Sequence, residues 1–176
     1  MSLRVSLGRL ADFRGDVVLR AIRADLDPVN VASREVAEEA GETIRTRLEQ
    51  TGELPVGGAV LTPGGALPAG FVIHVVTSSR DEPETPATVE RGLRNALRRA
   101  ADWEMDSLAV PPLGTGVGVL TLEDAARLQV RILAEHLQEG IPPREITVVV
   151  GNAYEEDVFS RLVAPLCDPA GEGNSG

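Results

Sequence analysis

The segment 107-SLAVPPLGTGVGVLTLEDAARLQVRIL-133 joins an apolar strand, a glycine-rich loop and an amphipathic helix. Three glycines stand at alternate positions of the loop, although glycine destabilises a fold wherever its conformational freedom is not needed. Thr121, followed by Asp124, is typical of a helix start. Ligands of open α/β sheets bind beyond the carboxyl ends of the strands, and a glycine-rich backbone before a helix presents N–H groups to an anion. The segment therefore predicts a strand–loop–helix unit suited to holding an anion.

The same alternation of strand and helix extends along the chain. Short runs rich in Val, Leu and Ile predict strands at 3–7, 16–22, 59–62, 71–77, 107–113 and 146–151. Helical spacing predicts helices from Ser33 to about Gly52, from Thr85 followed by Pro86, from Thr121, and from about Glu155 to Leu166. This order predicts an α/β fold with a mostly parallel sheet covered by helices on both faces.

Composition narrows the class of protein. The chain has 176 residues, which suits one domain at 1–167, and its small polar end at 168–176 predicts a disordered tail. A net charge of −10 argues against a nucleic-acid surface. The single Cys167 excludes an internal disulfide, and no spacing of ligand residues suggests a metal or another cofactor. No signal peptide or membrane span is evident, so we expect a cytoplasmic protein without a membrane partner.

Two stretches together resemble the macro domain, the ADP-ribose-binding module. They are the segment 107–133 and 56-VGGAVLTPGGALPAGFVIHVV-76, whose strand–turn–strand pattern ends in V-I-H. The resemblance covers about residues 3–166. It implies a three-layer α/β/α sandwich with a six-stranded mixed sheet, and ADP-ribose or a related phosphate-bearing nucleotide as the ligand. It also implies a phosphate-binding loop made of Leu113, Gly114, Thr115, Gly116, Val117, Gly118 and Val119.

Other positions depart from the pattern of that family. Arg9 stands where family members have an aspartate that hydrogen-bonds adenine, and arginine can only donate. Arg20 and Arg23 replace two asparagines, the second of which orients the distal ribose. The segment 28-PVNVASR-34 contains no glycine where the resemblance implies a first phosphate loop, and its valines resist the backbone conformations that such a loop needs. Adenine recognition, first-loop phosphate binding and the hydrolytic asparagine are therefore not carried over.

Arginines near these strand ends are candidate ligand contacts. Arg20, Arg23 and Arg34 could serve a smaller or more anionic ligand. The alternative is that the arginines pair with the acidic residues nearby, namely Asp16, Asp25, Asp27 and Glu35. Positions 20 and 23 face opposite ways in an extended strand, so they cannot both point into one pocket while the strand continues.

Aromatic and histidine side chains add one further candidate. Tyr154 follows the last strand and is a candidate for stacking on a base. His74 ends an apolar run, where a packing or hydrogen-bonding role is expected rather than catalysis, and His136 is expected at the surface of its helix.

Three functions remain open. The first is binding of ADP-ribose or a related phosphate-bearing nucleotide through residues 113–119. The second is a degenerate macro fold that serves as a scaffold or as the subunit of a homo-oligomer. The third is removal of ADP-ribose by hydrolysis, which the replaced asparagine at Arg23 disfavours. The sequence therefore favours a binding protein over an enzyme.

Overall fold

Six strands form one sheet with helices on both faces. The computed structural model describes residues 1–115 and 120–167. The strands are β1 (Ser2–Leu7), β2 (Val17–Arg23), β3 (Ala59–Pro63), β4 (Phe71–Ser78), β5 (Ser107–Val110) and β6 (Glu145–Val150). The helices are α1 (Val31–Ala40), α2 (Glu42–Thr51), α3 (Pro86–Asp102), α4 (Leu122–Gln138) and α5 (Ala153–Cys167), with a 3-10 turn η1 at Leu10–Asp12.

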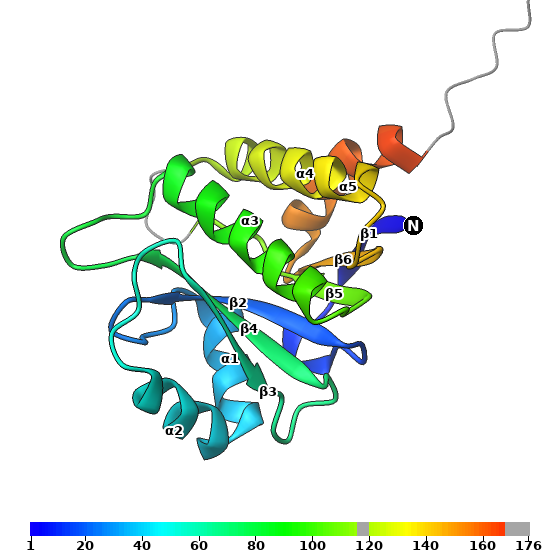
Figure 1. Cartoon of the computed structure of the whole chain (residues 1–176). Coiled ribbons are helices and arrows are strands. Elements are labelled where there is room, and N and C mark those ends of the chain that lie inside the picture. Colours follow the sequence, from blue (N-terminus) through cyan, green and yellow to red (C-terminus); the bar gives the residue numbers. More distant parts are fainter. Residues whose placement is uncertain (116–119, 168–176) are drawn as a thin grey trace, which may run out of the picture.

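The strand order is β1-β6-β5-β2-β4-β3, and only β3 runs antiparallel to its neighbour, β4. The predicted α/β/α sandwich with a mixed, mostly parallel sheet is confirmed. Helices α3, α4 and α5 cover one face and α1 and α2 cover the other (Figure 1). Because parallel strands share a direction, the carboxyl ends of β1, β6, β5, β2 and β4 lie at one edge of the sheet, where ligands bind in folds of this kind.

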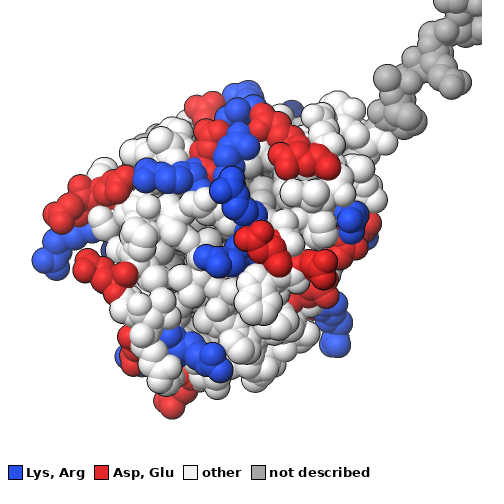
Figure 2. Space-filling model, in the orientation of Figure 1, with Lys and Arg blue, Asp and Glu red and all other residues white. Residues whose placement is uncertain are grey.

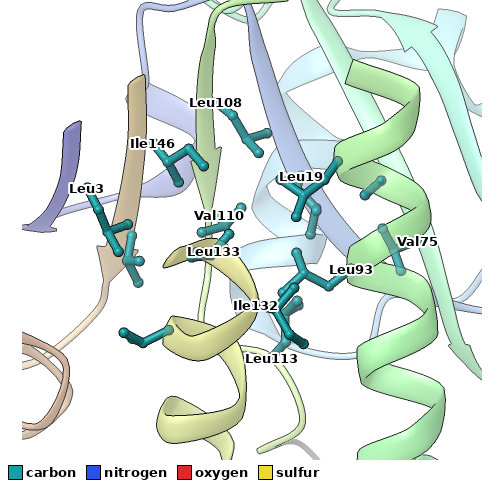
Figure 3. Packing of buried hydrophobic residues seen from close by; sticks show 14 of the residues in the cluster. Leu3, Leu19, Val75, Leu93, Leu108, Val110, Leu113, Ile132, Leu133 and Ile146 are labelled. Atoms are coloured by element: carbon teal, nitrogen blue, oxygen red, sulfur yellow. The ribbon is translucent and has the colours of Figure 1, made fainter. Parts of the chain in front are cut away.

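Strand β2 lies centrally, so it is buried on both faces. Leu19 packs with Val75, Leu93 and Ile132 on the side of α3 and α4 (Figure 3). Val18 and Ile22, which alternate with Leu19, face the opposite layer beneath α1 and α2. This explains why the strand lacks the polar alternation of a half-exposed strand.

The predicted helix from Ser33 to Gly52 is wrong in detail. Gly41 has a φ of 91°, which breaks the helix into α1 and α2, and the carbonyl oxygen of Ala40 accepts from the amide of Ala66 instead. The N-cap is Asn30 rather than Ser33, because the Asn30 side chain accepts from the Ser33 amide. A pattern of apolar residues with helical spacing continues across Gly41, which is why the break is not evident from spacing alone.

Other boundaries differ less. Strand β5 ends at Val110, before two prolines that cannot donate to the ladder, so the predicted strand 107–113 was too long. Thr85 and Thr121 cap α3 and α4 as predicted.

The expected surface position of His136 is wrong, because this side chain is buried and lies 3.2 Å from the carbonyl oxygen of Pro143. The predicted disordered tail, 168–176, lies outside the described residues.

The surface mixes charges of both signs. Arginines and acidic side chains lie interspersed over the face formed by α3 and α4 (Figure 2). In this region Arg94 and Arg131 share the carboxylates of Glu90 and Glu135. Trp103 is 59% exposed where α3 ends, at the edge of the sheet where the strands begin. No described helix has the length and apolar character required to cross a membrane.

Candidate functional site

A pocket of about 470 Å³ opens at the carboxyl ends of β1, β5 and β6. It lies where the parallel topology predicts a ligand site. One wall is the start of α1, another is the segment after β5, and a third is the turn between β6 and α5. The lining residues are Gly8, Arg9, Leu10, Asn30, Val31, Ala32, Glu35, Pro111, Pro112, Thr115, Val149, Gly151, Asn152 and Glu155. We call this pocket the strand-end cleft.

The first turn of α1 contributes backbone donors to the strand-end cleft. Asn30 caps the helix with its side-chain oxygen 2.9 Å from the amide of Ser33. The amides of Val31 and Ala32 precede the first intrahelical hydrogen bond, which runs from Arg34 to Asn30. Both residues line the cleft, so the positive end of the helix dipole faces it. A glycine-free segment can therefore still offer N–H groups to an anion.

The predicted phosphate loop begins at the opposite wall. The Leu113 amide donates to Gln129 Oε1 at 2.9 Å, and Gln129 Nε2 donates to the carbonyl of Pro111 at 2.8 Å. Gln129 is fully buried on α4 and so clamps the start of the loop. Gly114 has a φ of 83°, a left-handed conformation that favours glycine. Thr115 lines the cleft, whereas Gly116, Val117, Gly118 and Val119 lie outside the described residues.

Arg9 lies on the rim of the strand-end cleft, among carboxylates. It pairs with Asp12, Glu35 and Glu39. Its hydrogen bond to Glu39 and the charge of that carboxylate raise the pKa of the guanidinium above its usual value. Since Glu35 and Glu155 also line the cleft, the charged side chains there do not create a positive field. Phosphate binding would have to depend on backbone amides.

The structure separates the other candidate arginines. Arg20 is buried and turned away from the strand-end cleft, with its Nε donating to His74 Nδ1 at 2.8 Å. Arg23 and Arg34 are exposed and do not line this cleft. Among the described residues none of these three arginines forms an ion pair, and of the four acids expected to pair with arginines only Glu35 does so, with Arg9. Asp16 instead accepts from the amides of Asp106 and Ser107, which ties β2 to the start of β5.

Tyr154 lies beside the cleft, on the first turn of α5. Its ring is exposed and its hydroxyl donates to Glu123 on the first turn of α4. The hydrogen bond and the charge of Glu123 raise the pKa of Tyr154, and the same bond lowers the pKa of Glu123. Tyr154 thus bridges the starts of two helices while leaving a ring face open to solvent.

Several lining residues were not predicted as site residues. Asn30 and Asn152 line the cleft although neither belongs to a recognisable motif, and Glu35, expected only as a partner of the arginines, lines it as well. The available signal was position, since Asn152 lies two residues beyond the carboxyl end of β6 and Asn30 precedes a helix after β2. In the part of the chain that the structure describes, no group of three or more His, Cys, Asp or Glu side chains could hold a metal ion.

A comparison with protein families shows to which family this chain belongs. The model described as "Macro domain" matches residues 30–129. The chain belongs to the macro domain family. The match contains the first turn of α1 and the segment after β5, whereas the other half of the cleft lining lies outside the matched range, namely Gly8, Arg9, Leu10, Val149, Gly151, Asn152 and Glu155.

Individual macro domains are similar over most of the chain. The O-acetyl-ADP-ribose deacetylase of Klebsiella pneumoniae is 30% identical over 169 residues, which span 91% of this chain and 95% of that protein. The Oceanobacillus iheyensis macrodomain, solved as a point mutant, superposes with a TM-score of 0.80 at 21% identity, covering 93% of this chain and 92% of that one. The Trypanosoma brucei macrodomain in complex with ADP-ribose gives a TM-score of 0.78 at 21% identity, covering 90% and 68%.

Proposed function

We propose that this macro domain binds ADP-ribose or a related phosphate-bearing nucleotide in the strand-end cleft. The observation that carries the proposal is the position of the α1 N-terminus: Val31 and Ala32, whose amides precede the first intrahelical hydrogen bond, line the same cleft as Thr115. Backbone donors at a helix N-terminus suit a phosphate group, because such donors need no net positive charge nearby. Family membership and a relative solved with ADP-ribose support the same ligand.

The test is calorimetric titration with ADP-ribose, with AMP, ribose 5-phosphate and inorganic phosphate for comparison. The decisive variant is Ala32→Glu, which puts a carboxylate in the first turn of α1 at the cleft. An acidic residue there favours the helix through its dipole but repels a phosphate. We expect a melting temperature that is unchanged or higher, together with an affinity for ADP-ribose reduced by about tenfold or more.

The chain offers a matched control in Ala87→Glu. Ala87 occupies the same second position of α3 that Ala32 occupies in α1, but it does not line the strand-end cleft. ADP-ribose affinity should be unaffected by this change. If the wild type and Ala32→Glu bind ADP-ribose equally well, the N-terminus of α1 is not part of the binding site. Absence of binding by all four ligands would favour the scaffold function, and the next measurement would be the oligomeric state.

A hydrolytic function has one specific observation in its favour, the similarity to the O-acetyl-ADP-ribose deacetylase of Klebsiella pneumoniae. Release of acetate from O-acetyl-ADP-ribose, and of ADP-ribose from a modified protein, can be assayed with the same preparation. Arg23 stands where the resemblance places the asparagine that orients the distal ribose. We therefore expect binding without turnover, and acetate release that is lost in Ala32→Glu would establish the enzyme instead.

A further inference from the structure

A second pocket of about 440 Å³ lies on the other side of α1 and shares no lining residue with the strand-end cleft. It is bounded by the segment 25–28 after β2 and by the facing sides of α1 and α2. Its apolar walls are formed by Leu26, Pro28, Ala37, Ile44 and Leu48. We call it the helical pocket. Nothing in the proposed nucleotide function uses it.

Arg20 lines the helical pocket and is only 2% exposed. Its Nε donates to His74 Nδ1, and its Nη1 donates to the carbonyl and the hydroxyl oxygen of Ser33, both at 3.3 Å. All these acceptors are neutral, since a ring nitrogen that accepts from arginine carries no proton. Among the described residues, no carboxylate forms an ion pair with Arg20.

A buried cation without a counter-charge is unfavourable. Desolvation lowers the pKa of Arg20 to about 10, which leaves it charged at neutral pH. The third nitrogen, Nη2, donates to no described residue, yet the described chain contains no fully buried side-chain nitrogen or oxygen that lacks a partner. Nη2 therefore retains access to the space of the helical pocket, where an anion would complete its bonding.

The rim of the pocket restricts which anion can enter. Asp25, Asp27, Glu38 and Glu42 are exposed around it, while Glu49 is paired with Arg45 at 3.1 Å. These carboxylates repel a doubly charged phosphate more than a singly charged carboxylate. They also attract a positive group at the outer end of a ligand. The apolar walls between Arg20 and the acidic rim suit an aliphatic chain.

We propose that the helical pocket binds a small aliphatic carboxylate, whose carboxylate group pairs with Arg20 while its chain lies against Leu26, Ile44 and Leu48. An ammonium group at the far end of the chain strengthens binding through the acidic rim. The preferred class is therefore an amino acid with its amino group distant from the carboxylate. Arginine suits this role because its planar fork matches a carboxylate.

Four probes of equal chain length test the proposal on the full-length protein by NMR titration. They are hexanoate, 6-aminohexanoate, hexylamine and hexanol. We expect hexanoate to shift the amides of α1 and α2 at millimolar concentration, 6-aminohexanoate to bind more tightly, and the two probes without a carboxylate to leave these amides unshifted. If hexylamine or hexanol binds as tightly as hexanoate does, the proposed pairing of the carboxylate with Arg20 is overturned.

Variants locate the binding. Ala37→Phe places a ring in the helical pocket at a half-buried position and leaves Arg20 itself unchanged, and we expect it to weaken hexanoate binding by about tenfold or more. Ala87→Phe, an equal change on the exposed first turn of α3, is the control and should bind as the wild type does. Unchanged binding in Ala37→Phe, or no amide shift with any probe, would refute the site.

Discussion

The imidazole of His74 is fully buried and forms hydrogen bonds on both sides of its ring. Nδ1 accepts from Arg20, so Nε2 carries the proton and donates to Thr62 Oγ1 at 2.8 Å. The chain of hydrogen bonds links β2, β4 and β3, which confirms the structural role expected for this residue. Burial, and then the charge of Arg20, lower the pKa of His74 well below 6.5.

This arrangement predicts loss of stability in mild acid. A histidine whose pKa is lowered by folding takes up its proton more readily in the unfolded chain, so stability falls as the pH drops below about 6.5. The slope for His74 approaches about 1.4 kcal/mol per pH unit. His136, whose pKa is also lowered chiefly by burial, contributes in the same direction but less, because its hydrogen bond with Pro143 and the charge of Glu139 oppose the shift.

Urea unfolding at several pH values between 5 and 8 measures this effect. The pKa values of Glu123, Glu135 and Glu145 are lowered from 4.5, so the stability that these carboxylates provide is lost only at more acidic pH. We expect His136→Gln to retain most of the dependence, since His74 remains. A free energy of unfolding that is constant or increases on acidification would contradict the assignment.

The packing of helices on the sheet depends on close approach at one glycine. Gly92 lies on the buried face of α3, and a methyl group there would lie 2.5 Å from Cγ1 of Val75 on β4. Alanine in place of glycine would stabilise an isolated helix by about 1 kcal/mol. Because overpacking a rigid core costs about 1–3 kcal/mol, we expect Gly92→Ala to destabilise the protein overall.

A double-mutant cycle tests whether the contact with Val75 causes the expected destabilisation. Val75→Ala removes the methyl group that the new side chain would strike, so the effect of Gly92→Ala in that background should be smaller or reversed. Thermal or urea unfolding of the four proteins supplies the numbers. Stabilisation by Gly92→Ala in the wild-type background would show that α3 can move away from β4 freely.

The elements differ in how well the sequence predicts them. The apolar runs of β2 and β4 and the threonine caps of α3 and α4 depend only on residues close together in the sequence. The sequence pattern was therefore sufficient to predict these elements. The break at Gly41 depends on a distant contact, the hydrogen bond from Ala66 to Ala40, which no local pattern contains. Arg20 was a candidate for the nucleotide site because it lies near a strand end, but its side chain points to the other side of α1. The direction of a side chain depends on the register of its strand, which is set by contacts with the neighbouring strands.

The molecule as a whole carries a net charge of −10, while ADP-ribose is itself an anion. Within the strand-end cleft Arg9 is already surrounded by carboxylates, so its positive charge does little to attract a phosphate from a distance. Under the proposed function, long-range repulsion therefore slows association, and added salt screens it over a Debye length of about 10 Å at 0.1 M.

We expect the association rate constant for ADP-ribose to increase with ionic strength, in contrast to binding by a basic surface. Stopped-flow or surface measurements at constant pH, with sodium chloride varied, would provide the rates. A neutral ribose derivative serves as the control and should show no such increase. A rate constant for ADP-ribose that falls with salt would indicate a positive field in the cleft.

The placement of two aromatic side chains has a practical consequence. The chain contains one tryptophan and one tyrosine, and they mark opposite edges of the sheet. Trp103 lies near the start of β5, whereas Tyr154 lies beside the strand-end cleft with its hydroxyl bonded to Glu123. The ultraviolet band of the phenol should therefore respond when the cleft is occupied, while the fluorescence of the distant indole should ignore the ligand. One unlabelled sample thus carries both an optical signal for binding and an internal reference for it.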